Sequence, residues 1–244
     1  MATAVVTGAS SGIGAASARA LAAAGFDIVL GARRVDRLRA VADEVSGTPL
    51  ELDVTDTASV ERFAAQVPAC DVLVNNAGGA KGLAPVGEAL EEDWRWMYDA
   101  NVLGTMRVTR ALLPRLREAA AGVVVNIGSV AGVEVYAGGA GYTAAKHGLR
   151  AVTETLRLEL LGTGIRVSEV APGLVNTEFS LVRLGDQAAA DKVYEGLTPL
   201  SAEDVAETIA WVATRPPHVS LGYIRITPTD QADSAHTHRR TDTS

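Results

Sequence analysis

Short, continuously apolar runs alternate with segments of helical periodicity along almost the whole chain. We expect strands at seven short β-rich segments, several of which are continuously apolar: residues 4–7, 27–30, 49–52, 71–74, 123–127, 166–170 and 223–227. Strands that are apolar at every position are typical of a parallel sheet covered on both faces. Because parallel strands need helical crossovers, the alternation predicts a single-domain α/β fold of the Rossmann type. This is a doubly wound parallel sheet of about seven strands with helices on both faces.

Two of the intervening segments show an apolar helix face. In residues 35–47 the apolar positions recur at helical spacing, and Gly47 provides a C-terminal stop. Residues 56–68 repeat the pattern, and Pro68 ends it. The positions expected to pack on the sheet are Leu38, Val41, Ala42, Val45, Val60, Phe63, Ala64 and Val67.

Composition excludes several classes of protein. The single cysteine, Cys70, cannot form a disulfide within the chain, and four histidines without a second cysteine suggest no metal site. The N-terminus does not resemble a signal peptide, and no apolar run reaches the roughly 18 residues of a membrane helix. A net charge of −7 disfavours nucleic acid and anionic membranes as partners. We therefore expect a cytoplasmic protein with a small-molecule substrate.

Two regions depart from the strand–helix rhythm. Residues 173–200 form a long segment before the last helix and strand, and such segments are more often lids or binding loops than inert insertions. Residues 230–244 contain no hydrophobic side chain larger than alanine, so they cannot build a core. We expect one domain over residues 1–229. The tail is expected to be disordered or, alternatively, ordered by a neighbouring subunit.

A glycine-rich turn, TGASSGIG at residues 7–14, follows the first predicted strand and opens an alanine-rich helix. The spacing GxxxGxG differs from the GxGxxG dinucleotide fingerprint but permits the same close backbone approach. The helix N-terminus offers free N–H groups and partial positive charge to a pyrophosphate, although a turn that binds nothing is the alternative. The residues expected to contact a dinucleotide here are Gly8, Ser10, Ser11, Gly12, Ile13 and Gly14.

The end of the second predicted strand indicates which dinucleotide. An NAD enzyme places an acidic residue there for the ribose 2′-hydroxyl, whereas this chain has Arg33 and Arg34. Guanidinium groups pair strongly with phosphate, which favours NADP over NAD. The alternative, two arginines that only decorate a helix start, is disfavoured because cations are unfavourable near a helix N-terminus.

Two further strand ends are expected on the same rim. Asp53 and Val54 end the third strand and would flank an adenine, and the fourth strand ends in NNAG. Open α/β sheets bind ligands at the carboxyl ends of their strands, near the topological switch point. Singly, each is an ordinary strand end. Together they extend the predicted cofactor site to Asp53, Val54, Asn76, Ala77 and Gly78.

Tyr142 and Lys146 lie four apart on one predicted helix face. A nearby ammonium and an oxidised nicotinamide would both favour the phenolate, lowering the phenol pKa toward neutrality. Such a tyrosine could exchange a proton with an alcohol or carbonyl as hydride moves. The spacing alone is common, and a partly exposed helix pair is the alternative.

Two other polar residues strengthen the chemical interpretation. Ser129 follows the fifth strand and could hold the substrate oxygen beside the phenol, or be only a cap serine. Asn101 falls inside a predicted helix, where asparagine is unfavourable. It could kink the helix and hold a water that reaches Lys146, or be a tolerated polar residue.

The motifs TGASSGIG, NNAG, Asn101, Ser129, YTAAK and Pro172-Gly173 resemble, in order, the short-chain dehydrogenase/reductase family over residues 1–229. The resemblance implies that Tyr142 is the acid/base and Ser129 the substrate-oxygen donor. Lys146 would bind the nicotinamide ribose and lower the Tyr142 pKa, and Asn101 would anchor a relay water. The implied cofactor contacts are Tyr142, Lys146, Pro172, Gly173, Val175 and Thr177. Homotetramers or homodimers built on residues 95–117 and 143–161 are also implied.

The segments VAPGLVNTEFSLVR and YAGGAGYTAAKHG further resemble NADP-dependent 3-hydroxy acid dehydrogenases that act on serine and allo-threonine. Substrate contacts would be Ser129, Tyr142 and Arg183, unless Arg183 is a solvated loop residue. We therefore expect NADP(H)-dependent hydride transfer with a small hydroxy or carbonyl substrate, 3-hydroxy acids among them. One alternative is a reductase of bulkier ketones or aldehydes, of secondary-metabolite or 3-oxoacyl type. Another is a catalytically silent NADP-sensing regulator.

Overall fold

One parallel sheet organises the chain, of which the computed structural model describes residues 1–240. Its strands are β1 (Thr3–Thr7), β2 (Asp27–Ala32), β3 (Thr48–Glu51), β4 (Val72–Asn75), β5 (Val123–Ile127), β6 (Arg166–Pro172) and β7 (Tyr223–Ile226). Their order is β3-β2-β1-β4-β5-β6-β7, and each neighbouring pair is parallel. The predicted doubly wound Rossmann-type sheet is confirmed.

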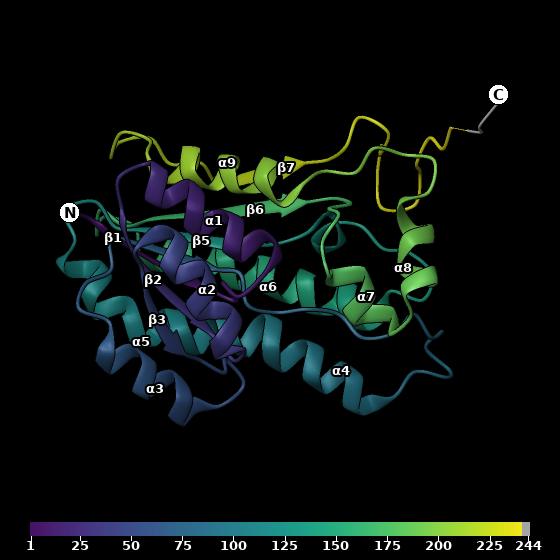
Figure 1. The fold of residues 1–244 in the computed structure, drawn as a ribbon, viewed down its shortest axis with the longest axis horizontal. Helices are drawn as coiled ribbons and strands as arrows, with labels where there is room; N and C mark the ends of the chain where they lie inside the picture. The colour runs from purple at the N-terminus through teal and green to yellow at the C-terminus, as the bar shows by residue number, and fades with distance from the viewer. Residues whose placement is uncertain (241–244) are drawn as a thin grey trace.

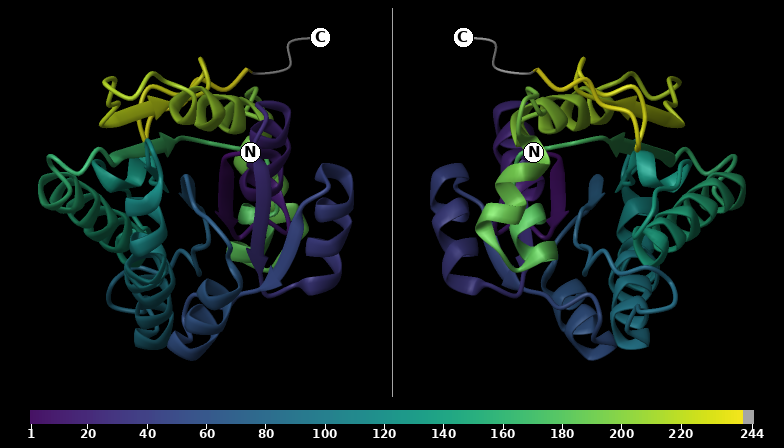
Figure 2. Two further views of the ribbon diagram at one scale, coloured as in Figure 1. Left: turned by 90° about the vertical axis from the view of Figure 1, so that its left-hand side faces the viewer. Right: turned by 90° about the vertical axis from the view of Figure 1, so that its right-hand side faces the viewer.

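Helices cover both faces of this sheet (Figures 1 and 2). One face packs against α1 (Gly12–Ala23), α2 (Val35–Val45) and α9 (Ala202–Ala213). The other packs against α3 (Thr57–Gln66), α5 (Gly104–Glu118) and the C-terminal end of α6 (Ala140–Glu159). Successive strand residues serve opposite faces, as Val5 and Val6 show by lying in different buried clusters. This two-sided burial explains the continuous apolar runs.

The predicted apolar faces of α2 and α3 are confirmed, but α2 ends differently. Its cap is Ser46 in the left-handed conformation (φ 51°), one residue before the glycine expected to stop it. A glycine is required at position 47 because neighbouring atoms leave no room for a side chain. A Cβ there would lie 2.6 Å from Leu30 Cδ1 and 2.9 Å from the Ile28 carbonyl oxygen.

The chain reverses direction across the sheet between β1 and β4, which places a crevice at their carboxyl ends. Beyond these ends lie α4 (Glu91–Tyr98), the π turn η1 (Asp99–Leu103) and the short 3-10 turn η2 (Val130–Gly132). The segment 173–200 contributes α7 (Phe179–Leu184) and α8 (Gln187–Tyr194) on the same side (Figure 1; Figure 2, right).

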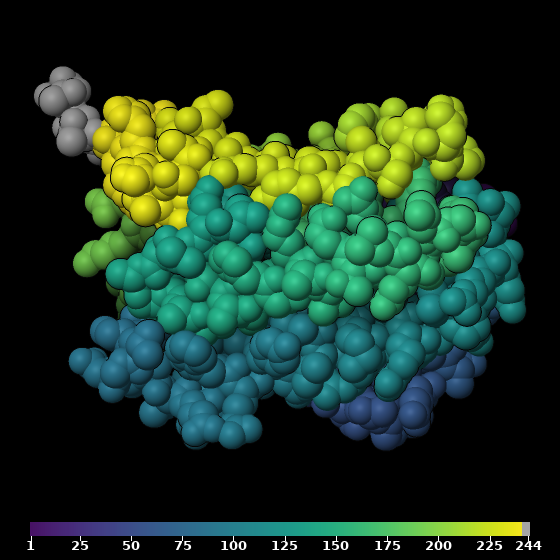
Figure 3. Space-filling view, turned by 180° about the vertical axis from the view of Figure 1, so that it is seen from behind, coloured from purple at the N-terminus to yellow at the C-terminus, as the bar shows by residue number. Residues whose placement is uncertain are grey.

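The C-terminal segment departs from the expected disorder over residues 230–240. Gln231 is buried and bridges to Thr237, and Ser234 N–H donates to Glu134. Arg239 donates to the carbonyls of Lys192, Val193 and Glu195 at the end of α8. Polar contacts to the folded domain thus position a segment that has no apolar core, visible in yellow along one edge in Figure 3. Residues 241–244 of the predicted tail lie outside the described part.

Residues 1–240 show neither a membrane-spanning helix nor a cluster of metal-ligating side chains. No helix there is long and apolar enough to cross a membrane. Nor does that region gather three or more His, Cys, Asp or Glu residues in a position to hold a metal ion. The free thiol of Cys70 is buried, and desolvation raises its pKa to about 12.

Candidate active site

The glycine-rich turn is shaped by Asn76 from the neighbouring strand end. Its Nδ2 donates to the Thr7 carbonyl at 2.9 Å and to the Gly8 carbonyl at 3.2 Å. Gly8 and Gly12 adopt positive φ (65° and 53°), which glycine tolerates without strain. A Cβ on Gly14 would lie 2.4 Å from the Gly8 oxygen. The turn is therefore a close-packed cradle that only glycines permit.

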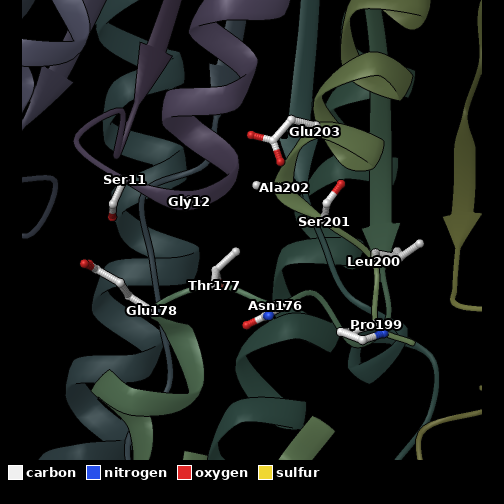
Figure 4. A pocket seen from close by; sticks show the side chains of 10 residues that line it. All are labelled: Ser11, Gly12, Asn176, Thr177, Glu178, Pro199, Leu200, Ser201, Ala202 and Glu203. Carbon is white, nitrogen blue, oxygen red and sulfur yellow. The ribbon is translucent and has the colours of Figure 1, made fainter. Parts of the chain in front are cut away.

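A cavity of about 570 Å³ opens beside this cradle, between the N-terminal ends of α1 and α9 (Figure 4). Three residues of the predicted cofactor site line it, Ser11, Gly12 and Thr177. The Thr177 side chain packs on Gly12, where a Cβ would meet it at 3.4 Å. Four other lining residues, Asn176, Glu178, Pro199 and Leu200, lie in segment 173–200, the predicted lid or binding loop. Ser201, Ala202 and Glu203 also line the cavity and were not predicted.

The arginines at the end of β2 behave differently from each other. Arg34 Nε donates to Ser10 Oγ at 3.2 Å and Nη2 to Ser11 Oγ at 2.5 Å, so this guanidinium borders the glycine turn. Arg33 is exposed and lies near Asp53, whose pKa it helps to lower. Arg37, one helical turn beyond Arg34, also faces the site through its ion pair with Glu178 at 2.7 Å. Its i, i+3 spacing from Arg34 was the available sequence signal.

These residues fit a 2′-phosphorylated dinucleotide. The cradle admits a close-lying pyrophosphate, and the α1 N-terminus supplies N–H donors and partial positive charge. Two serine hydroxyls and the Arg34 guanidinium converge where β2 ends, the place of the ribose in such folds. The chain that ends β2 carries no acidic residue of its own, such as would favour an unphosphorylated ribose.

The rest of the predicted adenine rim lies at the strand ends as expected. Asp53 Oδ1 accepts from Thr55 N–H at 2.9 Å and Thr55 Oγ1 at 2.7 Å. Burial opposes ionisation of Asp53, yet these hydrogen bonds and Arg33 lower its pKa. Val54 is buried, and the Thr7 hydroxyl accepts from the N–H groups of Asn76 and Ala77. The Asp53 carboxylate is therefore engaged with its own turn.

Ser129, Tyr142 and Lys146 converge at the carboxyl end of β5. The Ser129 hydroxyl accepts from Ala131 N–H at 3.1 Å, which caps η2, and lies close enough to Tyr142 to lower its pKa. Tyr142 is buried in the first turn of α6, and Lys146 follows one turn later. The Lys146 ammonium donates to the Ile127 carbonyl at 2.8 Å and lies 5.8 Å from the Tyr142 ring centroid.

Burial has the largest effect on the pKa values of Tyr142 and Lys146. It raises the pKa of Tyr142 well above the ordinary value, although the Ser129 hydroxyl and the positive charge of Arg183 act to lower it. Burial also lowers the pKa of Lys146 to about 8, against the Glu169 carboxylate. The expected lowering of the Tyr142 pKa by Lys146 therefore does not hold in the chain alone. The reasons are desolvation and an ammonium directed at Ile127.

Asn101 lies in the π turn between α4 and α5, so the helix is distorted as predicted. Its Nδ2 donates to the carbonyls of Met97 at 2.7 Å and Gly79 at 2.8 Å, and its Oδ1 accepts from Gly79 N–H. A Cβ on Gly78 would lie 2.4 Å from Asn101 Oδ1. The side chain therefore ties the helix to the loop after β4.

Helix α7 holds Arg183 beside the Tyr142 ring. Its Nε donates to the Gly82 carbonyl at 3.0 Å and Nη1 to the Tyr136 hydroxyl at 2.9 Å. The guanidinium carbon lies 5.4 Å from the Tyr142 ring centroid. Phe179, also on α7, packs at 5.6 Å from the same ring. The alternative of a solvated loop arginine does not describe this half-buried helical residue.

The remaining predicted cofactor residues follow β6. Pro172 ends the strand, and Val175 receives a hydrogen bond from the Tyr194 hydroxyl at its carbonyl (2.8 Å). A Cβ on Gly173 would lie 2.1 Å from Gln231 Oε1, the atom that accepts from Leu174 N–H at 2.8 Å. Gln231 thus supports the site from the tail. No local sequence signal marked it.

A buried polar chain fixes the strand ends beneath the site. Asn75 Nδ2 donates to Asn126 Oδ1 at 2.9 Å, and Asn126 Nδ2 donates to Thr153 Oγ1 at 2.9 Å. Asn75 also bonds to Thr109, so β4, β5, α5 and α6 are joined. Of these residues, only Asn75 belongs to the NNAG motif. Asparagine inside the apolar run VVVNI was the signal for Asn126.

Comparison with known proteins shows which family this chain matches. The short chain dehydrogenase family matches residues 2–185. An uncharacterized oxidoreductase of Mycobacterium tuberculosis is 60% identical over 233 residues, 95% of this chain and 93% of that one. A sulfoacetaldehyde reductase of Chromohalobacter salexigens is 44% identical over 240 residues (94% and 95%).

Further relatives lie closer to the predicted subgroup. The NADP-dependent 3-hydroxy acid dehydrogenase YdfG of Salmonella typhimurium is 44% identical over 236 residues (93% and 95%). The solved closed form of serine dehydrogenase complexed with NADP⁺ superimposes with a TM-score of 0.92. It is 39% identical, with 98% of this chain and 100% of that one covered. The predicted resemblance is confirmed, and the chain belongs to the short chain dehydrogenase family.

Proposed function

We propose that this protein is an NADP(H)-dependent oxidoreductase that transfers hydride between the nicotinamide and a small, anionic hydroxy or carbonyl substrate such as a 3-hydroxy acid. The observation that carries the substrate class is the half-buried Arg183 guanidinium beside the Tyr142 ring. The relatives of this chain include enzymes named for serine, 3-hydroxy acids and sulfoacetaldehyde, and each of these compounds carries an anionic group. A positive charge at this position suits that shared chemistry.

Tyr142 is the proposed proton donor and acceptor. Because burial keeps its pKa high, the phenol is protonated at neutral pH and can give its proton to a carbonyl oxygen. Ser129, which lies beside the phenol, would hold the same oxygen. The bound cofactor supplies or accepts the hydride. In the oxidative direction Tyr142 would first lose its own proton and then, as the phenolate, take the alcohol proton; the positive charges of Arg183 and of an oxidised nicotinamide would favour that phenolate.

The supporting roles remain those implied by the family. Lys146 would bind the nicotinamide ribose, and Asn101 would anchor a relay water. The proposed cofactor residues are Gly8, Ser10, Ser11, Gly12, Ile13, Gly14, Arg33, Arg34, Asp53, Val54, Asn76, Ala77, Gly78, Tyr142, Lys146, Pro172, Gly173, Val175 and Thr177. The cradle, the cavity and the Arg34–serine contacts support this set.

Arg183 has a donor to spare for a substrate anion. Gly82 and Tyr136 engage Nε and Nη1, and within residues 1–240 no hydrogen bond is made by Nη2. A carboxylate or sulfonate bound there would lie beside the reacting oxygen, as in a short 3-hydroxy acid. A guanidinium so fixed loses little side-chain entropy on binding.

Two other functions remain as alternatives. A reductase of bulkier ketones or aldehydes would use the same proton donor, but the half-buried arginine favours a small anion. A silent NADP-sensing regulator would not need a serine, a tyrosine and a lysine at one strand end. All three are present, which favours turnover.

A substrate panel tests the proposal. Oxidation of serine, 3-hydroxybutyrate and related acids with NADP⁺, and reduction of sulfoacetaldehyde with NADPH, would be compared with neutral analogues lacking the anion. We expect higher kcat/KM for the anionic members and for NADP(H) over NAD(H). Turnover of bulky neutral ketones alone would establish the first alternative. Tight NADPH binding without turnover would establish the regulator.

We also propose that the protein is cytoplasmic and forms a homotetramer or homodimer through α4, α5 and α6. Exposed apolar side chains on and just after two of these helices support the assembly: Tyr98 on α4 is 48% exposed, Leu158 on α6 is 76% exposed, and Leu161, just after α6, is 84% exposed. Light scattering coupled to size exclusion distinguishes the assemblies from a monomer.

A further inference from the structure

A carboxylate forms ion pairs with two guanidinium groups at the proposed position of the 2′-phosphate. Glu178 Oε2 lies 2.9 Å from Arg34 Nη1, and Glu178 Oε1 lies 2.7 Å from Arg37 Nη1. Arg34 also contacts Ser10 and Ser11. These charge-assisted bonds lower the pKa of Glu178, so the side chain is anionic at neutral pH.

Glu178 reaches the arginines from a distant segment. It precedes α7 and lines the cavity together with Ser11 and Gly12. In Figure 4 its side chain lies on the same side as Ser11 and points away from Ser201 and Glu203. The side chain of Thr177, the preceding residue, packs on Gly12, and this contact holds Glu178 at this edge.

A phosphate and a carboxylate compete for the same donors. Both accept N–H bonds from guanidinium groups, and the phosphate carries more charge and more acceptor oxygens. Each ion pair here is about half exposed, with side-chain exposures of 42–54%. Such pairs contribute little free energy each, so an incoming phosphate can displace them.

We propose that Glu178 is a cofactor-selectivity residue that competes with the 2′-phosphate of NADP(H) for Arg34 and Arg37. The inference rests on the proposed use of NADP(H) and goes beyond it. Glu178 keeps the guanidinium pair compensated and positioned before the cofactor binds, at a cost in NADPH affinity. NADH, which lacks the phosphate, leaves this contact in place.

The test is equilibrium binding to the full chain, measured by NADPH and NADH fluorescence titration. Calorimetry with adenosine 2′,5′-bisphosphate and ADP isolates the nucleotide end from the nicotinamide. In Glu178→Gln we expect NADPH and the 2′,5′-bisphosphate to bind about two- to fivefold more tightly, with NADH and ADP unchanged. Glu203→Gln is the matched control, because it removes an acid from the same cavity that makes no hydrogen bond to Arg34 or Arg37 within residues 1–240.

Two outcomes overturn the proposal. Weaker NADPH binding in Glu178→Gln would mean that the carboxylate positions the arginines for the phosphate without competing. Equal gains for NADPH and NADH, matched by Glu203→Gln, would mean that only the charge of the cavity matters. Failure of the proposed cofactor use would appear separately, as wild-type protein binding NADPH no more tightly than NADH. Thermal melts confirm that both variants are folded.

Discussion

The carboxylate of Glu169 lies 3.8 Å from the guanidinium of Arg150, and it is fully buried on β6. Within residues 1–240 neither Glu169 oxygen has a hydrogen-bond partner. Arg150 stacks on Tyr223 at 4.2 Å. Burial raises the pKa of Glu169, whereas Arg150 and Lys146 lower it and Glu154 raises it. An ion pair so weakly compensated costs stability when charged.

Replacing this acid should therefore change how stability depends on pH. A raised pKa stabilises the fold below the unfolded value of about 4.3, and that contribution is lost as pH rises toward the folded value. The Glu169→Gln variant has no carboxyl group at this position, so it does not lose this stability as pH rises. Above about pH 4.3, and up to the raised pKa of the folded state, we expect the unfolding free energy of the variant to rise with pH relative to wild type, by at most about 1.4 kcal/mol per pH unit.

Urea unfolding at a series of pH values measures this difference. The exposed Glu159→Gln, at the end of α6, serves as the matched control and should show no comparable trend. A difference for Glu169→Gln that is flat or falls with pH would contradict the argument.

Removing the Tyr142 hydroxyl should separate chemistry from binding. Tyr142→Phe keeps the ring that packs on Phe179 and under Arg183 but loses the proton donor. We expect kcat to fall by about 10²- to 10⁴-fold, with NADPH affinity nearly intact. Steady-state rates and fluorescence titration check the two parts. Tyr98→Phe, on the exposed end of α4, should leave both unchanged; retained activity in Tyr142→Phe would remove Tyr142 from the mechanism.

Arg183 should discriminate substrates by charge. In Arg183→Met, the loss of a charge-assisted contact should raise KM for anionic substrates by about 10- to 100-fold. Neutral carbonyls of similar size should be affected much less. The control is Arg215→Met, an arginine that stacks on Trp211 on α9 and is remote from Tyr142 in sequence and fold. Equal losses for anionic and neutral substrates would indicate a structural role instead.

Much of the fold could be predicted because its signals are local. Apolar runs gave the strands, and helical spacing gave the buried faces of α2 and α3. Gly47 shows the limit of such reasoning. Its identity reflects the packing of Leu30 and Ile28, which no helix-stop rule contains.

The residues of the candidate site also differ in whether local sequence signals could predict them. Ser129, Tyr142 and Lys146 could be predicted because each follows a strand or shares one helix face. Glu178 could not be linked to Arg37, since the two are 141 positions apart and meet only through the sheet topology. The high pKa of Tyr142 also escaped prediction, because spacing reveals a nearby charge but not the degree of burial.

The single thiol should be inert in the folded protein. Cys70 is 1% exposed, and burial raises its pKa to about 12, so almost no thiolate exists at pH 8. We expect no reaction with Ellman's reagent in native protein and one thiol per chain after denaturation. Rapid labelling of native protein would show that the region around β4 opens readily.

Gln231 should contribute stability from a tail that the sequence marked as unable to build a core. Its Oε1 accepts from Leu174 N–H, and Gly173 leaves the room that the amide fills. Gln231→Ala leaves a part-buried N–H without a partner, which should lower the unfolding free energy by about 1–3 kcal/mol. Because Leu174 lies beside the predicted cofactor residues, KM for NADPH should also rise. The exposed Gln66→Ala on α3 is the control, and a variant of Gln231 as stable as wild type would mean that residues 230–240 detach in solution.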